Sequence, residues 1–215
     1  MTDLLLVRHG QSVSNAGLRT VRPHLTELTA VGEAQARLTA AALPEPRLIA
    51  VSPYHRARAT AQPFIERWPA VPRVEWPVQE FTFLDPSAWD DTTALDRRPA
   101  VEAYWQRADP HGADNGGAES FAQLLERIDL VRHDCQTFAQ GPIVVFTHGL
   151  FSKVFIWRCL DPEAAPTAEG MARARDFARR FAFPNGGIVR GRLEGDGATF
   201  EPADTSHLPM DVKSD

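Results

Sequence analysis

Residues 4–10, Leu-Leu-Leu-Val-Arg-His-Gly, place an arginine and a histidine directly after a short apolar run. An uninterrupted apolar run predicts a strand that is covered on both faces, as in a parallel sheet. Ligands of open α/β sheets bind at the carboxyl ends of such strands. A guanidinium beside an imidazole, followed by a glycine that permits a sharp turn, suits a doubly charged oxyanion such as a phosphoryl group.

Two further apolar runs also end in polar residues. Residues 143–147 lead into His148 and Gly149, and residues 48–51 lead into Ser52, with Arg56 one helical turn later. Carboxyl ends of parallel strands meet at one edge of a sheet, so these side chains are expected to converge with Arg8 and His9. Core packing does not explain such a convergence, and an anion site does.

The rest of the chain alternates between strand and helix patterns. This alternation predicts an α/β fold: a three-layer α/β/α sandwich with a mostly parallel sheet, formed as one domain over residues 1–215. We expect Ser52 to cap the helix that follows it, with Pro53 at the first position. We also expect a polar, frayed C-terminal tail. The predicted helices are 29–43, 53–68, 96–106, 119–138, 149–160 and 167–180, and the further strands are 74–78 and a hairpin over 186–200.

Residues 81–118 are irregular and rich in proline and aromatic residues, which predicts an inserted cap over the site. The helical segment 163–183 is expected to lie near the site as well. Two readings of the cap remain open. Its aromatic residues either line a pocket or pack the insertion against the core, and Arg97 and Arg98 either meet a second anionic group or lie in solvent. The aromatic residues concerned are Phe81, Phe83, Trp89, Tyr104 and Trp105.

Composition narrows the class of protein. The chain has 215 residues and a net charge of −5, which gives no electrostatic basis for binding nucleic acid. The apolar runs are too short to cross a membrane. Cys135 and Cys159 have no metal or redox spacing and are expected to be buried thiols. We therefore expect a cytoplasmic protein with a small-molecule partner; the sequence does not indicate an oligomeric state.

Four blocks of the chain together resemble the histidine phosphatase superfamily, the phosphoglycerate mutase-like proteins. Residues 6–15 (Leu-Val-Arg-His-Gly-Gln-Ser-Val-Ser-Asn) match the family signature, and residues 28–36 match its next segment. Residues 52–61 match the segment with the second arginine, and residues 147–149 match the segment with the second histidine. The blocks stand in family order, and the resemblance is to the phosphatase branch.

The resemblance implies a role for each matching residue. His9 is the expected nucleophile that becomes phosphohistidine, and Arg8, Asn15, Arg56 and His148 are the expected phosphate-binding residues. Arg56 is preferred over Arg58 because it precedes an alanine as the family arginine does. Independently, attack needs a neutral imidazole, which neighbouring arginines favour by lowering the pKa of the histidine.

The general acid is expected at Glu80, where the family places its acidic residue. The sequence departs from the family pattern after Phe81, so Asp85 and Asp90 are alternative acids. The mechanism requires no metal and no cofactor. The expected function is hydrolysis of a small phosphate ester by a metal-independent phosphomonoesterase.

Three alternatives stay open at this point. One is a phosphomutase, although Phe81-Thr82-Phe83 replaces the Arg-His-Tyr-Gly that follows the acidic residue in phosphoglycerate mutases. Another is a catalytically silent protein that binds a phosphate-bearing ligand. The third is a serine hydrolase, because residues 10–14 (Gly-Gln-Ser-Val-Ser) partly resemble a nucleophile elbow at Ser12.

Overall fold

Six strands form one sheet in the order β3-β2-β4-β1-β5-β6. The computed structural model describes residues 1–20, 22–115, 117–138, 141–161 and 163–214. Strands β1 to β4 run parallel to one another, and β5 and β6 are antiparallel additions at one edge. The strands are β1 (Thr2–Arg8), β2 (Leu48–Val51), β3 (Arg73–Glu75), β4 (Ile143–Thr147), β5 (Ile188–Glu194) and β6 (Gly197–Phe200).

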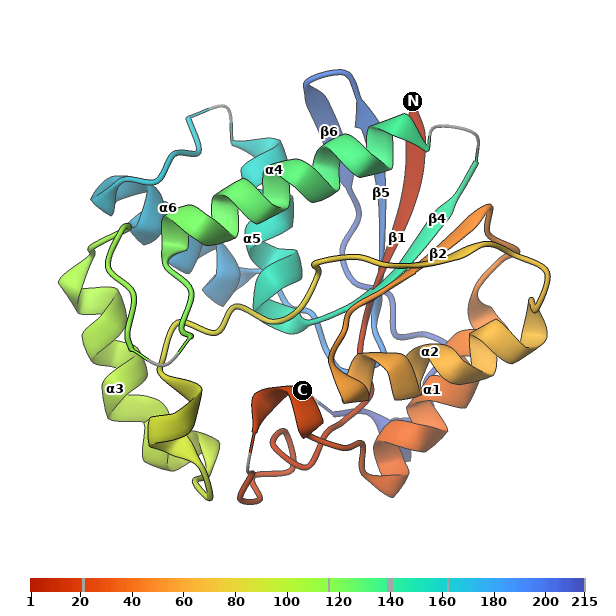
Figure 1. The fold of residues 1–215 in the computed structure, drawn as a ribbon. Helices are drawn as coiled ribbons and strands as arrows, with labels where there is room; N and C mark the ends of the chain where they lie inside the picture. The colour runs from red at the N-terminus through yellow and green to blue at the C-terminus, as the bar shows by residue number, and fades with distance from the viewer. Residues whose placement is uncertain (21, 116, 139–140, 162, 215) are drawn as a thin grey trace.

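Helices cover both faces of this sheet (Figure 1), which confirms the predicted three layers. Helices α1 (Ala30–Ala42) and α2 (His55–Arg67) pack on the face that carries Leu5 and Val7 of β1. Helices α4 (Phe121–Thr137) and α5 (Gly149–Leu160) pack on the face that carries Leu4 and Leu6. Helices α3 (Ala94–Arg107) and α6 (Ala168–Arg180) join that second layer.

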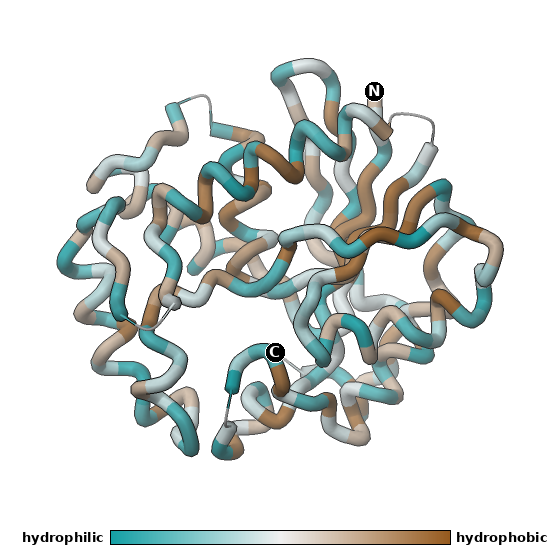
Figure 2. The backbone as a smooth tube through the Cα atoms, in the orientation of Figure 1, coloured by the Kyte–Doolittle hydropathy of each residue, from teal (hydrophilic) through white to brown (hydrophobic). Residues whose placement is uncertain are grey.

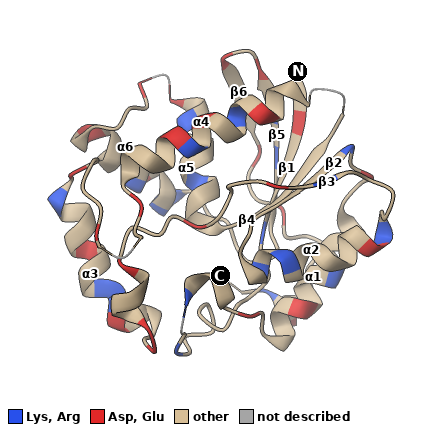
Figure 3. Cartoon of the chain, in the orientation of Figure 1, with Lys and Arg blue, Asp and Glu red and all other residues tan. Residues whose placement is uncertain are grey.

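The central strands contribute side chains to the two hydrophobic cores, one on each face of the sheet. Every residue of β2 and β4 is buried, and these strands lie in the hydrophobic centre of Figure 2. Each fully buried Val, Leu, Ile or Phe side chain contributes roughly 1.5–3 kcal/mol. The strands β2 and β4 carry no charged residues, which lie on the helices, the loops and the other strands (Figure 3).

The topology creates a crevice at the carboxyl ends of β1 and β4. The chain leaves β1 toward α1 on one face, and it leaves the neighbouring β4 toward α5 on the other face. Such a switch point is where open α/β sheets bind ligands. Arg8 ends β1, and His148 directly follows β4, so both residues lie at this crevice.

Three local predictions were wrong. Helix α2 begins at His55 with Tyr54 at its N-cap, and the hydroxyl of Ser52 bonds His148 and accepts from the backbone N–H of Tyr54. Strand β3 ends at Glu75, two residues before Pro77, which has no N–H to donate to a ladder. The C-terminal tail is hydrogen-bonded to the domain and not frayed: the carbonyl of Val212 accepts from Nε2 of Gln35, and the carbonyl of Ser214 accepts from the backbone N–H of Asn185.

The predicted insertion contains a short 3-10 helix, η2 (Pro86–Trp89), and α3. Helix α3 begins with a capping box between Thr93 and Asp96, which explains why it starts two residues earlier than predicted. Two further 3-10 helices, η1 (Pro23–Leu25) and η3 (Met210–Val212), lie in the loop after β1 and in the tail. In the described part of the chain, every helix is too short or too polar to cross a bilayer.

Candidate active site

His9 lies at the end of β1 with 3% of its surface exposed. Its Nδ1 lies 2.7 Å from the carbonyl oxygen of Gly10, and Nε of Arg56 donates to its Nε2 at 3.0 Å. A carbonyl can only accept, so Nδ1 carries the proton and Nε2 keeps the lone pair. This network selects one tautomer of the imidazole, in which the lone pair of Nε2 accepts the hydrogen bond from Arg56.

The surroundings of His9 keep its ring neutral. Burial lowers the pKa of His9 well below its usual value, and the charges of Arg56 and then Arg8 lower it further. The sequence argument therefore identified the right direction, but burial has a larger effect than like charge. A neutral imidazole at physiological pH is a competent nucleophile.

Arg56 lies in the first turn of α2 and is buried. Its Nη1 donates to the carbonyl of Pro23 at 2.6 Å, and its guanidinium lies 5.1 Å from the centre of the Tyr54 ring. Burial lowers the pKa of Arg56 to about 10, so it remains charged at neutral pH. Arg58 instead is exposed and pairs with Glu75, away from the site.

His148 is fully buried and its ring centre lies 5.0 Å from that of His9. Its Nε2 lies 2.7 Å from the hydroxyl oxygen of Ser52. Its Nδ1 has no hydrogen-bond partner among the residues that the structure describes. Burial, Arg56 and His9 lower the pKa of His148 well below its usual value. A neutral ring whose Nε2 accepts from Ser52 leaves an N–H on Nδ1 for a ligand.

Asn15 is oriented by three donors on one side of its amide. Its Oδ1 accepts from the backbone N–H of Ser12 at 3.2 Å, from the Ser12 hydroxyl at 2.8 Å and from Nδ2 of Asn185 at 3.2 Å. These contacts leave the NH₂ of Asn15 as the donating end at the cavity. The Ser12 hydroxyl is thereby used to orient Asn15, which disfavours the serine hydrolase reading.

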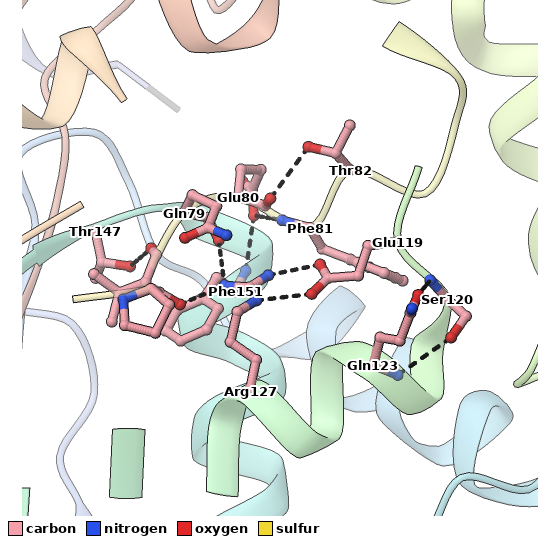
Figure 4. Close-up of polar contacts among 12 residues, drawn as sticks. Gln79, Glu80, Phe81, Thr82, Glu119, Ser120, Gln123, Arg127, Thr147 and Phe151 are labelled. Atoms are coloured by element: carbon pink, nitrogen blue, oxygen red, sulfur yellow. Dashed lines mark hydrogen bonds and ion pairs between the residues drawn. The ribbon is translucent and has the colours of Figure 1, made fainter. Parts of the chain in front are cut away.

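Glu80 lies at the N-terminus of α5 (Figure 4). Its carboxylate accepts backbone N–H bonds from Phe151 at 2.8 Å, Phe81 at 3.1 Å and Leu150 at 3.2 Å. The alternative acid Asp85 also borders the cavity, but its carboxylate binds Ser87. Asp90 is exposed and does not line the cavity.

The extended segment that leads to Glu80 is held by Arg127 of α4. Arg127 is buried, with 8% of its surface exposed. Arg127 donates to the carbonyls of Pro77 at 2.7 Å and Gln79 at 3.0 Å, and it forms a two-bonded ion pair with Glu119 (Figure 4). The hydroxyl of Thr147 donates to the carbonyl of Val78 at 2.7 Å. These hydrogen bonds fix the backbone of the residues that precede Glu80 and thereby position its side chain.

Gly10 is required because the backbone of Gly32 lies very close to it. A Cβ at this position would lie 2.3 Å from the carbonyl oxygen of Gly32, at the start of α1. Conversely, a Cβ on Gly32 would lie 2.1 Å from the carbonyl oxygen of Gln11. Gly10 is not among the residues with positive φ. The glycine is therefore needed for space and not for a positive φ, and the two glycines let the loop after β1 approach the start of α1.

These residues border a cavity of about 270 Å³, near the lower end of the range for small-molecule sites. Of the predicted site residues, Arg8, His9, Asn15, Arg56 and Glu80 line it, and His148 lies behind them. The aromatic residues of the cap divide between the two expected roles. Phe81, Phe83 and Trp89 line the cavity, whereas Tyr104 and Trp105 are packed in the core.

The segment between α6 and β5 supports the loop at His9. The carbonyl of Phe183 accepts from Arg8, and Nδ2 of Asn185 donates to the carbonyl of His9 at 3.0 Å. The backbone N–H of Gly186 donates to the carbonyls of Arg8 and His9. Helix α6 itself does not line the cavity, so the expected segment 163–183 approaches the site only through its last residues.

Sequence reasoning missed Asn185, Arg127 and the pairing of Ser52 with His148. Asn185 lies 176 residues from His9 in the chain, and Arg127 occupies a position that reads as one polar residue of an amphipathic helix. The one available signal was Pro184-Asn185-Gly186-Gly187 before a strand, which is typical of any turn. Among the described residues, no group of three or more His, Cys, Asp or Glu side chains could hold a metal ion.

A mostly parallel sheet with two histidines and two arginines at its carboxyl edge defines an α/β protein with a cationic site at the switch point of the sheet. The sequence model of the histidine phosphatase superfamily (branch 1) matches residues 4–201. The chain belongs to this superfamily. A comparison with curated protein sequences gives no significant match.

Solved structures share the fold. A phosphoserine phosphatase of Entamoeba histolytica superposes with a TM-score of 0.74 at 23% identity, over 97% of this chain and 100% of that chain. An α-ribazole phosphatase of Shigella flexneri gives 0.71 at 22% identity, over 94% and 96%. A mycobacterial glucosyl-3-phosphoglycerate phosphatase gives 0.70 at 22% identity, over 95% and 98%.

Proposed function

We propose that this protein is a phosphomonoesterase that hydrolyses a small phosphorylated metabolite through a phosphohistidine on Nε2 of His9. The observation that carries the proposal is the 3.0 Å contact between Nε of Arg56 and Nε2 of His9. It places a guanidinium donor at the one imidazole nitrogen that has a lone pair. A phosphoryl group bound to that arginine would lie next to the nucleophile.

In the first step, Nε2 of His9 attacks phosphorus and the N–P bond forms as the bond to the ester oxygen breaks. The electron pair of that bond goes to the leaving oxygen, which takes a proton from Glu80. In the second step, water attacks phosphorus, the N–P bond breaks and Glu80 accepts a proton from the water. The products are an alcohol and inorganic phosphate, and His9 returns to its neutral form.

Four groups would hold the phosphoryl oxygens during transfer. Arg8 and Arg56 supply charge, the NH₂ of Asn15 supplies a donor, and Nδ1–H of His148 supplies another. Donors placed in advance around developing charge typically contribute about 2.7–4 kcal/mol each to the barrier. The hydrogen bonds of Asn15 and His148 support this role, because they set the donating end of each side chain before a ligand binds.

Residues 81–118 act in this proposal as a cap within one domain, and they select the substrate. Phosphoserine, α-ribazole phosphate and glucosyl-3-phosphoglycerate differ widely, so the neighbours' names favour a small phosphate ester without choosing one. The thiols of Cys135 and Cys159 are both buried and unpaired, which supports a reducing cytoplasm as the compartment.

The test is hydrolysis of p-nitrophenyl phosphate in the presence of a chelator. We expect metal-independent turnover in the wild type, loss of turnover in His9→Ala, and an acid-labile, base-stable phosphoenzyme after rapid quenching with ³²P-labelled substrate. Metal-dependent turnover, or unchanged turnover in His9→Ala, would contradict the proposal. Binding of phosphate esters without turnover would instead support the catalytically silent alternative.

A further inference from the structure

Arg97 in the first turn of α3 lies in the wall of the cavity that contains His9. The sequence presents it as one of two adjacent arginines, but the structure separates their environments. Arg98 is exposed, whereas Arg97 is half-buried and faces the loop that follows β1. One arginine of the pair is therefore available to a ligand in the cavity.

The hydrogen bonds of Arg97 all go to neutral groups. Its Nη1 donates to the carbonyl of Thr92 at 3.0 Å, to the Thr92 hydroxyl at 2.9 Å and to the Thr20 hydroxyl at 3.5 Å. Its Nη2 donates to the hydroxyl of Ser14 at 3.3 Å. These contacts hold the guanidinium in place at the cavity wall and leave Nε–H and part of Nη2 for another acceptor.

No carboxylate among the described residues hydrogen-bonds to Arg97; burial lowers the pKa of Arg97, and the charge of Asp96 offsets this only in part. None of the ion pairs found among the described residues includes Arg97. The nearest acidic neighbour in sequence, Asp96, uses its carboxylate to cap α3 through Thr93. Asp85 borders the same cavity, but its carboxylate binds the N–H and hydroxyl of Ser87. A partly buried cation that has no carboxylate in direct contact is stabilised further when a ligand supplies an anion.

The position of Arg97 relates it to the proposed phosphate site. Ser14, its partner, is directly followed by Asn15, and both residues line the cavity. Apolar side chains of the cap border the same space, namely Leu84, Pro86, Trp89 and Val101. The cavity thus combines the cluster around His9, a second fixed cation and an apolar wall.

We propose that Arg97 binds a second anionic group of the substrate. The substrate is then a small phosphate monoester that carries a carboxylate or a second phosphate on a partly apolar body. This inference rests on the proposed phosphatase function and specifies its substrate class.

The test uses three esters with the same four-carbon chain: butyl phosphate, 4-phosphooxybutanoate and butane-1,4-diol bisphosphate. They end in a methyl group, a carboxylate and a second phosphate. We expect kcat/KM for at least one of the two anionic esters to exceed that for butyl phosphate by tenfold or more. The ester that shows the preference distinguishes a carboxylate site from a phosphate site. Equal kcat/KM for all three esters in the wild type would overturn the inference.

The matched variants are Arg97→Met and the neighbouring Arg98→Met. In Arg97→Met we expect the preference to disappear, with kcat/KM for butyl phosphate within threefold of the wild type. Arg98→Met should retain the preference. An Arg97→Met variant that loses activity on all three esters equally would show that Arg97 only ties the loop to the cap, and the inference would fail.

Two further measurements distinguish failure of this inference from failure of the proposed function. If Arg97→Met does not fold, the charge-retaining Arg97→Lys and the wild-type preference across increasing salt decide the question, because an ionic contact weakens with salt. We expect Arg97→Lys to keep part of the preference because it keeps the charge, and a preference that is unaffected by salt would contradict the inference. Absence of turnover on all three esters and on p-nitrophenyl phosphate would refute the proposed function itself, whereas turnover without preference refutes only this inference.

Discussion

Nε of Arg56 donates to Nε2 of His9 at 3.0 Å, while Nδ1 of the same ring lies 2.7 Å from the carbonyl of Gly10. The two contacts together fix the tautomer and the direction of the lone pair. Burial lowers the pKa of His9 most and Arg56 lowers it further, so Arg56 both orients the proposed nucleophile and helps to keep it neutral. The charge of Arg56 and the protonation state of His9 are therefore coupled.

Replacing Arg56 by methionine should raise the pKa of His9, because a nearby positive charge that opposes protonation is removed. Less of the ring is then neutral at acidic pH, so the acid limb of the kcat/KM profile should move to higher pH. Burial remains the larger cause of the low pKa, so the shift should be partial. We also expect kcat to fall about 10²–10³-fold from lost charge stabilisation.

The control for this prediction is Arg58→Met on the same helix. Arg58 is exposed and pairs with Glu75, so both the pH profile and kcat should stay as in the wild type. A full pH–rate profile of p-nitrophenyl phosphate hydrolysis measures both quantities. An unchanged acid limb in Arg56→Met would show that the arginine does not set the protonation state of His9.

Asn185 should act on phosphate binding through Asn15. Asn185→Ala removes the Nδ2 donor to Asn15 Oδ1 and to the His9 carbonyl, which leaves the Asn15 amide oriented by Ser12 alone. We expect KM to rise about tenfold with a smaller change in kcat, and we expect a loss of about 0.5–1.5 kcal/mol of stability for each lost hydrogen bond. A double-mutant cycle with Asn15→Ala measures the coupling, and additive effects would show that the two amides act separately.

The strand-end polar residues were predictable because each follows an apolar run directly. The runs before Arg8, His148 and Ser52 fix which residues leave the sheet at its carboxyl edge, and the parallel arrangement brings them together. Arg56 was predictable from its place one turn into a helix. The same local logic failed for Ser52, since a serine before a proline reads as a helix cap until His148 is known to be adjacent.

The supporting residues could not be predicted because their partners are far away in the chain. Asn185 contacts His9 and Asn15 only through the antiparallel return of β5 beside β1. Gly10 is needed because of Gly32, which is a tertiary contact. Such contacts depend on the order and register of the strands, which local patterns in a single sequence do not determine.

Gly10→Ala should destabilise the protein, because the added methyl group would lie 2.3 Å from the backbone oxygen of Gly32. Backbone atoms cannot move aside as a flexible side chain can, so we expect a loss of about 1–3 kcal/mol, in the range of overpacked sites. Chemical denaturation measures the change. Gly197→Ala is the control, because its added Cβ would have only an ordinary contact at 3.5 Å. Equal stability of the two variants would contradict the close approach of the loop after β1 to the start of α1.

The buried histidines should make stability fall with acidity. The pKa values of His9 and His148 are well below 6.5 in the folded state, so the unfolded chain binds these protons first. Stability is therefore fully present above about pH 6.5 and is lost as the pH falls toward the folded-state values. Each histidine contributes up to about 1.4 kcal/mol per pH unit in that window.

Urea denaturation between pH 7.5 and pH 5 measures this slope. His148→Gln should reduce the slope by up to about 1.4 kcal/mol per pH unit, because the glutamine side chain does not titrate. A wild-type free energy of unfolding that stays constant from pH 6.5 to pH 5 would contradict the low pKa values of both rings.

The ion pair between Arg127 and Glu119 should be far more important than its exposed counterparts. Arg127→Met leaves the Glu119 carboxylate and the carbonyls of Pro77 and Gln79 without their donor. Breaking a buried pair from one side costs about 3–5 kcal/mol, and the loosened segment also displaces Glu80, so kcat should fall with the stability.

The matched control is Arg158→Met, which breaks a more exposed pair with Asp129. Such pairs contribute about 0–1 kcal/mol, and Arg158 lies away from the cavity lining, so kcat should be unchanged. Denaturation and p-nitrophenyl phosphate turnover, measured below the unfolding transition of each variant, separate the two effects. If Arg127→Met lowers stability but leaves kcat intact, Arg127 supports the core only and does not position Glu80.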